Sequence, residues 1–363
     1  MKALTVGGAM IDTIAIIESD RIERMSMLNA EISFLLLEEG RKTEALDISM
    51  HCGGGAVNTS IALARLGLDV AAMVKLGRDE RAETVVARLM EEGVSTRWVS
   101  RDPRAPTGGS VLVSSHERNA AVFTFRGANT LLDPSDLDED AFAVDLIYIS
   151  HLSNKSADCF PLIIEKAKAH GALIAVNPGV RQLSARGDPV QECLPQVDIL
   201  AINRAEADVM VTNFVAQFGE GGPALALEPG EQPPALAARG LASGGFEMSL
   251  PKFFGALRQL GTKCTLLTDG LGGAFVCHKD EILFCPARDA EVAGTAGAGD
   301  AFAATFAAFL ALGEPGEAAL KGAAVNAASV VTHVDTQTGL MTREAIEARL
   351  GDAPDFPVRK WPL

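Results

Sequence analysis

Short apolar runs alternate with helical stretches along most of this chain, and no other feature restricts its fold as much. Strand-like runs occupy residues 4–8, 70–77, 144–150, 172–177, 197–203 and 264–270. Strands that alternate with helices form a parallel sheet with helices on both faces, and such sheets bind ligands at the carboxyl ends of their strands. The alternation therefore predicts an α/β fold with a mostly parallel central sheet and a ligand site along one of its edges.

The helical pattern is clearest in residues 79–93, and a second example covers residues 156–171. In the first, Asp79 can cap the amino end and Gly93 can end the helix. One apolar face is expected from Val85, Val86, Leu89 and Met90.

The run from Gly294 to Asp300 places three glycines and a carboxylate at the start of an apolar helix. Glycines let the backbone approach a ligand closely, and the first N–H groups of a helix lack internal partners, so this start can bind a phosphate. Asp300 beside such an anion is placed to accept a proton from a hydroxyl that attacks it. Alternatively, Asp300 only caps the helix, because acidic N-caps are common.

A second glycine run, Gly53-Gly54-Gly55, opens another helix, which contains Asn58 and which Gly67 can end in a left-handed conformation. The run that ends at Asp300 is not a Walker loop, because no Lys-Ser/Thr pair closes it. It is not a dinucleotide fingerprint either, because it does not follow the first strand.

Together, the two runs resemble the paired signatures of the ribokinase-like (PfkB) carbohydrate kinase family. In that family a Gly-Gly run leads to an Asn-containing helix, and an Asp-Thr-Thr-Gly-Ala-Gly-Asp run opens a later helix. Both runs occur here in the same order and far apart. Further matches span most of the chain: Val6-Gly7-Gly8 with Asp12, Arg126-Gly127-Ala128-Asn129, Asn203-Arg204-Ala205-Glu206, and Thr268-Asp269-Gly270 with Gly272-Gly273.

The resemblance implies a ribokinase-like three-layer α/β/α core with a small β lid. The core is expected in residues 1–12, 51–106 and 127–363, where it binds nucleotide and substrate. The lid is expected in residues 13–50 and 107–126, which read as strand pairs around polar turns. In the family such lids cover the sugar and often form a dimer interface, and the apolar run in the first lid segment favours a homodimer through the lid.

For the acceptor sugar, the resemblance implies that Asp12, Gly53, Gly54 and Asn58 hold its hydroxyl groups. Asp12 could instead stabilise a turn, and Asn58 could only cap a helix. Arg126 could bind an anionic group of the substrate or pair with lid carboxylates.

For the reaction, the resemblance makes Asp300 the general base that deprotonates the acceptor hydroxymethyl group. Gly297, Ala298 and Gly299 form the loop around the γ-phosphate, and the first N–H groups of the helix stabilise the charge that builds there.

For the nucleotide, Asn203 and Glu206 match a family motif whose carboxylate acts through water on magnesium, although the pair could also be a solvated helix face. Thr268 and Gly270 match positions near the nucleotide phosphates. Asn326 either borders the adenine or is a packing amide.

Two stretches have open interpretations. The turn from Asn177 to Arg181 ends a core strand and either reaches the phosphate edge or is only a tight Pro-Gly turn. Residues 215–245 are rich in Gly, Pro and Ala without a clear period, which favours a loop or passive insertion over an adenine-side flap.

Two departures from the family pattern concern a monovalent cation. Gly294 and Ala296 stand where many relatives carry Asp and Thr, and Asp335 stands where they often have Gly. These positions help to bind an activating cation in several members, so potassium activation is in doubt, whereas ATP and Mg²⁺ remain the expected cofactors.

Composition excludes some partners. The net charge of −15 argues against a nucleic-acid backbone, and aromatic residues at 5% argue against base stacking. No run approaches the roughly 20 apolar residues that cross a bilayer. Six cysteines without C-x-x-C spacing indicate a reducing compartment, so a cytoplasmic location is expected.

These observations predict an ATP-dependent kinase that phosphorylates a primary hydroxyl of a sugar or sugar acid. The alternatives are a nucleoside (adenosine-like) kinase of the same fold and a non-catalytic binding protein that keeps this fold.

Overall fold

The computed structural model describes residues 1–18, 23–26, 33–36, 40, 42–115, 120–352 and 356–363. Parts of the expected first lid segment therefore lie outside the described residues.

Ten strands of the described chain form one central sheet, in the order β18-β17-β16-β15-β12-β11-β10-β1-β6-β7. The seven strands from β15 to β7 in that order pair in parallel, and the other three are antiparallel. All six strand-like runs of the sequence are strands of the parallel part, as predicted. The bounds are β1 (Lys2–Gly7), β6 (Asp69–Leu76), β7 (Ser100–Arg101), β10 (Leu146–Ile149), β11 (Leu173–Val176), β12 (Ile199–Asn203), β15 (Cys264–Thr268), β16 (Ala274–His278), β17 (Glu281–Cys285) and β18 (Arg359–Pro362).

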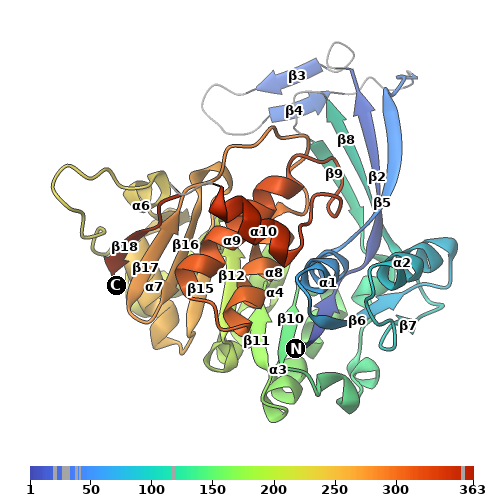
Figure 1. Ribbon diagram of the computed structural model, residues 1–363, viewed down its shortest axis with the longest axis horizontal. Coiled ribbons are helices and arrows are strands. Elements are labelled where there is room, and N and C mark those ends of the chain that lie inside the picture. Colours follow the sequence, from blue (N-terminus) through green and yellow to red (C-terminus); the bar gives the residue numbers. More distant parts are fainter. Residues whose placement is uncertain (19–22, 27–32, 37–39, 41, 116–119, 353–355) are drawn as a thin grey trace.

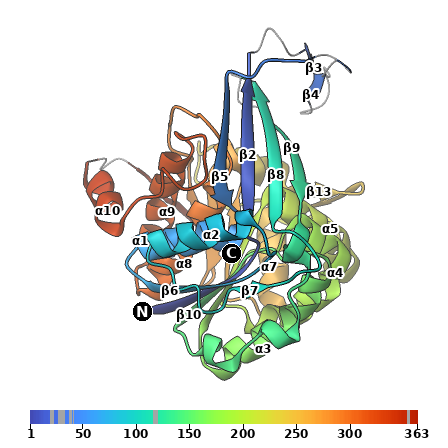
Figure 2. The ribbon, with the colours of Figure 1, turned by 90° about the vertical axis from the view of Figure 1, so that its right-hand side faces the viewer.

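Helices cover both faces of this sheet (Figure 2). One layer packs small side chains such as Ala3 and Ala72 of the sheet against α1 (Gly55–Arg65), α2 (Glu80–Glu91), α8 (Ala298–Ala311), α9 (Gly316–Val330) and α10 (Arg343–Gly351). The other packs larger ones such as Leu4 and Ile147 against α3 (Phe160–Ala169), α4 (Val180–Cys193), α5 (Arg204–Phe218) and α7 (Leu250–Gln259). The expected three-layer α/β/α arrangement is confirmed.

A second, four-stranded sheet projects from the core (Figures 1 and 2). Its order is β5-β2-β8-β9, from β5 (Asp47–Gly53), β2 (Met10–Ile17), β8 (Gly108–Ser115) and β9 (Ala120–Phe125). We call it the lid sheet. Asp12 belongs to its strand β2, opposite His51 of β5 and Ser110 of β8, so the lid sheet itself carries residues expected in the substrate site.

Smaller elements complete the fold. A hairpin of β3 (Glu23–Ser26) and β4 (Ser33–Leu36) lies beyond the lid sheet (Figure 1). Within residues 215–245, α5 continues to Phe218, and α6 (Ala235–Arg239) and β13 (Leu241–Ser243) follow, with β14 (Phe246–Met248) pairing on β13. Short 3-10 helices lie at Gly127–Thr130, Pro134–Asp136, Glu139–Phe142, Asn154–Cys159, Leu194–Gln196 and Gly270–Gly272.

Helix α2 confirms the predicted cap but corrects one core residue. Asp79 is the N-cap and accepts a hydrogen bond from the Ala82 N–H. Val85 and Leu89 are fully buried, but Met90 is 64% exposed, because the buried face runs through Ala82 instead. No helix in the described part of the chain is long and apolar enough to cross a membrane.

Candidate active site

Helix α8 begins with backbone N–H groups that no side chain caps. Its N-cap is Gly297, whose φ of 79° is the left-handed conformation that glycine tolerates best. A Cβ on Gly297 would lie 2.6 Å from the Cβ of Thr336, so the close packing there also requires glycine. Asp300 is the third residue of the helix and not its cap. The arrangement leaves the N–H groups of Ala298, Gly299 and Asp300 available to an anion, beside a carboxylate, whereas the Ala301 N–H already donates to the Gly297 carbonyl.

Asp300 is held by Asn58 of α1, a residue 242 positions earlier in the chain. The Asn58 Nδ2 donates to Asp300 Oδ2 at 2.8 Å. The Asn58 Oδ1 accepts from Thr336 Oγ1 at 2.8 Å and from Gln337 Nε2 at 3.2 Å. Because two donors occupy the amide oxygen, the amide nitrogen is turned toward Asp300. Asn58, expected to hold the sugar, therefore also orients the carboxylate.

Gln337 connects this arrangement to β5 and α2 and makes a further contact with α1, the helix that carries Asn58. Its Nε2 donates to the carbonyl of Cys52 at 2.8 Å, and its Oε1 accepts from Arg88 Nε at 3.1 Å. Arg65 Nη1 donates to the Gln337 carbonyl at 2.9 Å. Sequence reasoning missed Thr336 and Gln337, because the only local signal was a short polar run after a helix.

The electrostatics of Asp300 suit a base that works near neutral pH. Burial raises its pKa to about 6, and the charge of Asp12 acts in the same direction, whereas the hydrogen bond from Asn58 lowers it. Asp300 is therefore mostly ionised at pH 7 and can still take up a proton readily.

Asp12 lies on the lid sheet, near enough to Asp300 for its charge to raise the pKa of that carboxyl. Ser110 Oγ donates to Asp12 Oδ1 at 2.5 Å, and burial raises the pKa of Asp12 although Ser110 and His51 oppose that shift. The Asp12 carboxylate lies directly over Gly53, where any Cβ would collide with it. Gly54, at φ 97°, brings its backbone so close to the loop after β1 that a Cβ would lie 2.6 Å from the Gly8 carbonyl oxygen. Both glycines are thus required by close approach.

Asn129 fixes the loop that leads into β2. Its Oδ1 accepts from the Ala9 N–H and its Nδ2 donates to the Ala9 carbonyl, both at 2.9 Å. Arg126, three residues earlier, directly follows the lid strand β9. Its Nη1 donates a hydrogen bond to Ser153 Oγ at 2.9 Å. Among the described residues it pairs with no lid carboxylate, which was one of the two alternatives.

At the amino end of α5, Asn203 and Glu206 cap the helix reciprocally. Asn203 Oδ1 accepts from the Glu206 N–H at 3.0 Å, and Glu206 Oε2 accepts from the Asn203 N–H at 2.8 Å. Asn177 Nδ2 also donates to Glu206 Oε2, at 3.4 Å. Burial raises the pKa of Glu206 to about 7, and the charge of Asp300 contributes to that rise. The charge of Asp300 therefore acts on Glu206 across the carboxyl ends of the central strands.

The remaining predicted nucleotide residues divide into two groups. Thr268 ends β15, and Gly270 begins the short turn after it with φ 52°, so both lie at the carboxyl edge of the sheet. Asn326 is fully buried between α8 and α9: its Nδ2 donates to Thr305 Oγ1 at 2.8 Å and its Oδ1 accepts from the Met341 N–H at 2.9 Å. These contacts favour the packing alternative for Asn326.

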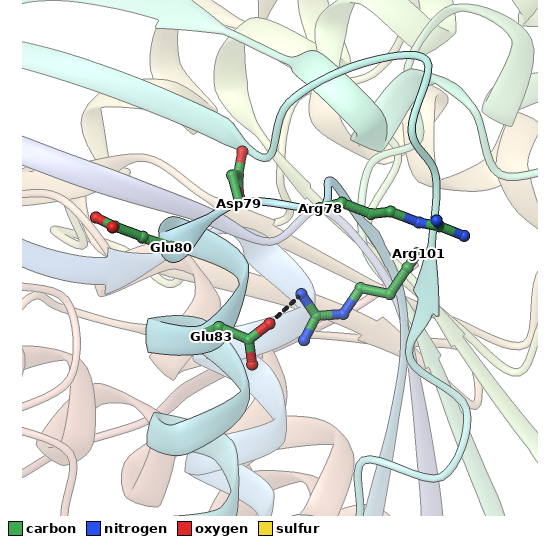
Figure 3. Close-up of a pocket in the computed structure, with 5 residues that line it drawn as sticks. All are labelled: Arg78, Asp79, Glu80, Glu83 and Arg101. Carbon is green, nitrogen blue, oxygen red and sulfur yellow. Dashed lines mark ion pairs between the residues drawn. The ribbon is translucent and has the colours of Figure 1, made fainter.

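An open hollow of about 740 Å³ lies beside α2 and β7, away from these residues (Figure 3). Its lining consists of Arg78, Asp79, Glu80, Glu83 and Arg101. Arg101 Nη1 pairs with Glu83 at 3.0 Å, and Asp79 accepts from the N–H and hydroxyl of Thr107 at 2.7 and 2.6 Å. In this lining, Arg101 joins β7 of the central sheet to α2, and Asp79 joins α2 to Thr107, just before the lid strand β8.

Comparison with known families identifies the arrangement. The pfkB family carbohydrate kinase pattern matches residues 23–216 and 250–343, which is most of the chain. The chain belongs to the pfkB family of carbohydrate kinases. It is therefore an ATP-dependent phosphotransferase that acts on a sugar hydroxyl, and the predicted family, fold and enzyme class are confirmed.

Individual pfkB relatives are distant but cover nearly the whole chain. The deoxyribokinase of Salmonella typhimurium is 26% identical over 330 residues, which cover 90% of this chain and 94% of the relative. The 5-dehydro-2-deoxygluconokinase of Bacillus subtilis is 24% identical over 317 residues, covering 84% and 88%. The structure of a putative ribokinase II from E. coli with ATP and Mg²⁺ superposes with a TM-score of 0.71 at 18% identity, covering 97% and 99%.

Proposed function

We propose that this pfkB kinase transfers the γ-phosphoryl group of ATP to a primary hydroxyl of a sugar, with Asp300 as the general base. The observation that carries the proposal is the position of Asp300 in the first turn of α8. There the carboxylate lies beside uncapped N–H groups, has a pKa near 6 and is oriented by Asn58. A base and an anion site on one helix end suit proton removal from a hydroxyl that attacks a phosphate.

The acceptor lies on the lid side of Asp300 in this proposal. The Asp12 carboxylate accepts hydrogen bonds from sugar hydroxyls, and Gly53 and Gly54 let the backbone lie close to Asp12 and to the loop after β1, which keeps that carboxylate in place. Asp12 keeps one oxygen bound to Ser110, which leaves the other for the sugar. Asn58 uses one amide hydrogen for Asp300 and has a second for the acceptor.

The nucleotide lies on the other side, along Asn203, Thr268 and Gly270. The N–H groups of Ala298, Gly299 and Asp300 stabilise the charge that develops on the transferred group. A magnesium ion, when bound, neutralises phosphate charge and orients the phosphates. Within the described residues no three carboxylate, histidine or cysteine side chains are grouped to hold a metal, so the chain fits an ion shared with phosphates and water, with Glu206 acting through a water molecule.

The enzyme acts as a homodimer through the lid sheet in this proposal. Exposed apolar side chains gather on the face of the lid sheet opposite Asp12: Ile48, Met50, Val111, Phe123 and Phe125 are 65%, 66%, 44%, 61% and 54% exposed. A second copy of the same sheet would remove them from water. We also propose a cytoplasmic location, with which the six unpaired cysteines agree.

The decisive experiment measures ADP release with ATP and Mg²⁺ over a panel of sugars, sugar acids, sugar phosphates and nucleosides. Release that depends on a sugar and disappears in Asp300→Asn supports the proposal. Preference for a nucleoside would select the nucleoside-kinase alternative. ATP binding without acceptor-dependent ADP release from any compound would contradict catalysis.

A further inference from the structure

Tyr148 is a fully buried tyrosine whose hydroxyl group forms no hydrogen bond with any described residue. It lies in β10 of the central sheet and packs in the layer that contains α1 and α8. The chain has 16 phenylalanines but one tyrosine, and the other fully buried rings of the described residues are phenylalanines, such as Phe142 and Phe306. Phenylalanine would fill this space without burying an unpaired hydroxyl, which is unfavourable. Packing alone therefore does not explain the hydroxyl.

Helix α1 brings Asp300 to the level of Tyr148. Ser150 lies two residues after Tyr148 and on the same face of the sheet, and a Cβ on Gly55, at the start of α1, would lie 2.7 Å from the Ser150 Cβ. From there α1 runs back toward the edge of the sheet where β6 begins. Asn58 lies three residues into this helix, about 4.5 Å along its axis, and its Nδ2 donates to Asp300 Oδ2 at 2.8 Å.

On its other side, Tyr148 has a small neighbour and a second carboxylate. Its partner in β11 is Ala175, which leaves room for the ring. Two residues further along β11, Asn177 Nδ2 donates to Glu206 Oε2 at 3.4 Å. The electrostatics agree with this placement, because burial and then the charges of Asp300 and Glu206 raise the pKa of Tyr148. The hydroxyl therefore lies among buried groups beneath these two carboxylates.

We propose that Tyr148 is a positioning residue for the base: its O–H donates a hydrogen bond, through one bridging water molecule, to the carboxylate of Asp300. The bridge is needed because no described residue bonds the hydroxyl directly, and buried water molecules serve polar groups of this kind. The carboxylate is then held from the sheet by Tyr148 and from α1 by Asn58. This inference rests on the proposed function, in which Asp300 is the base.

Two other titratable groups act on the same arrangement. Beyond the effect of burial, Asp12 on the lid sheet raises the pKa of Asp300, and Asp300 raises the pKa of Glu206 at the start of α5. The neighbours that do not titrate are Thr5 of β1, Ala175 of β11 and Asn58 of α1. Loss of the Tyr148 hydroxyl removes a donor to Asp300 and leaves every acidic group in place, so the pKa of Asp300 should rise.

Because the chain has one tyrosine, its hydroxyl can be followed without a substitution. Protein labelled isotopically at the phenol carbon Cζ of tyrosine gives one NMR signal. We expect this signal to shift with a midpoint near pH 6, where Asp300 takes up a proton. The step should disappear in Asp300→Asn and remain in Glu206→Gln. A signal that does not move between about pH 5 and pH 8, or a step that persists in Asp300→Asn, would overturn the inference.

Kinetics of Tyr148→Phe on the identified acceptor give a second test. The acid limb of kcat/KM should move upward by about half a pH unit to one unit, which lowers kcat/KM by about three- to tenfold near pH 5. The loss should shrink to less than about twofold near pH 8, where Asp300 is ionised in both proteins. KM for ATP should hardly change. The control is Thr262→Val, which removes another buried, unpartnered hydroxyl just before β15, at the opposite edge of the sheet, and should not move the limb.

An acid limb that Tyr148→Phe leaves in place would contradict the inference. An equal loss at every pH, accompanied by a lower melting temperature, would mean that the hydroxyl only supports packing. The NMR titration needs no turnover and so separates this inference from the proposed function. A tyrosine step that depends on Asp300, together with normal turnover of Asp300→Asn, would contradict the base only. An inactive Asp300→Asn with an unresponsive tyrosine signal would contradict this inference only.

Discussion

The two carboxylates of the candidate site, Asp300 and Asp12, are held by different numbers of hydrogen bonds. Asp300 stands on a core helix and is oriented by Asn58, which Thr336 and Gln337 hold in turn. Asp12 stands on β2 of the lid sheet and, among the described residues, forms one side-chain hydrogen bond, with Ser110 on the next strand. The core helix is covered by packed layers, whereas the lid sheet projects from the molecule (Figure 2).

This difference suggests the hypothesis that Asp300 serves the chemical step and Asp12 serves binding of the acceptor. A base must keep its geometry throughout the reaction, so a rigid surrounding with several hydrogen bonds is an advantage. A group that binds the acceptor has to admit and release it. A sheet that projects from the core can move as one unit to allow this. The following predictions test whether the two carboxylates can be separated in this way.

The largest effect is expected at the core carboxylate. Asp300→Asn should keep the fold and lower kcat by roughly a hundredfold or more, because the amide cannot accept the hydroxyl proton. Steady-state kinetics on the identified acceptor, with circular dichroism as the folding control, measure it. Near-normal turnover of the variant would remove Asp300 from the role of base.

The lid carboxylate should affect binding more than turnover. Asp12→Ala should weaken acceptor affinity by about 1.5 to 3 kcal/mol, roughly ten- to a hundredfold, because a charge-assisted hydrogen bond is lost. ATP affinity should hardly change. Isothermal titration with each ligand separately checks this, and equal losses for both ligands would mean that Asp12 supports the fold instead.

The pH dependence of kcat/KM should reveal how the hydrogen bond from Asn58 sets the pKa of Asp300. Because the ionised form is the active one and its pKa is about 6, kcat/KM should fall as the pH drops through that region. Asn58→Leu removes the hydrogen bond that lowers this pKa, so the acid limb should move to higher pH. Thr336→Val, which only loosens Asn58, should move it less. Glu206→Gln is the control, because a limb that vanishes in that variant belongs to Glu206.

The smallest effect is expected for the monovalent cation. Replacing sodium by potassium at fixed ionic strength should change turnover by less than about threefold, since a weakly hydrated ion needs several well-placed oxygens. A Cβ on Gly294 would lie 3.0 Å from the His333 carbonyl oxygen, and Asp335 Oδ1 already accepts two backbone N–H groups at 2.7 Å. Strong potassium activation would show that other oxygens form the site.

The sequence predicted the parallel strands, the two glycine turns and the kinase family because each has a local pattern. The strands alternate with helices, and Gly54 and Gly297 adopt positive φ where a side chain would collide. Met90 was assigned to the wrong face because helical periodicity alone does not decide between neighbouring stripes.

The supports of the site could not be predicted in that way. Thr336 and Gln337 lie 278 and 279 residues from Asn58 in the chain. Such contacts depend on tertiary packing and leave no period or motif in a single sequence. For Asn326 the sequence left the adenine border and a packing role open, because its burial and its contacts with Thr305 and Met341 depend on how the helices pack.

The long separation between Asn58 and its supports has a consequence for biosynthesis. At roughly 5 to 20 residues per second, Asn58 is added to the growing chain about 14 to 56 s before Thr336. A nascent chain that already contains Asp300 therefore still lacks the two donors that turn the Asn58 amide toward it. The candidate site therefore acquires its full hydrogen-bonded support only after Gln337 has been added, later than either of its two carboxylates.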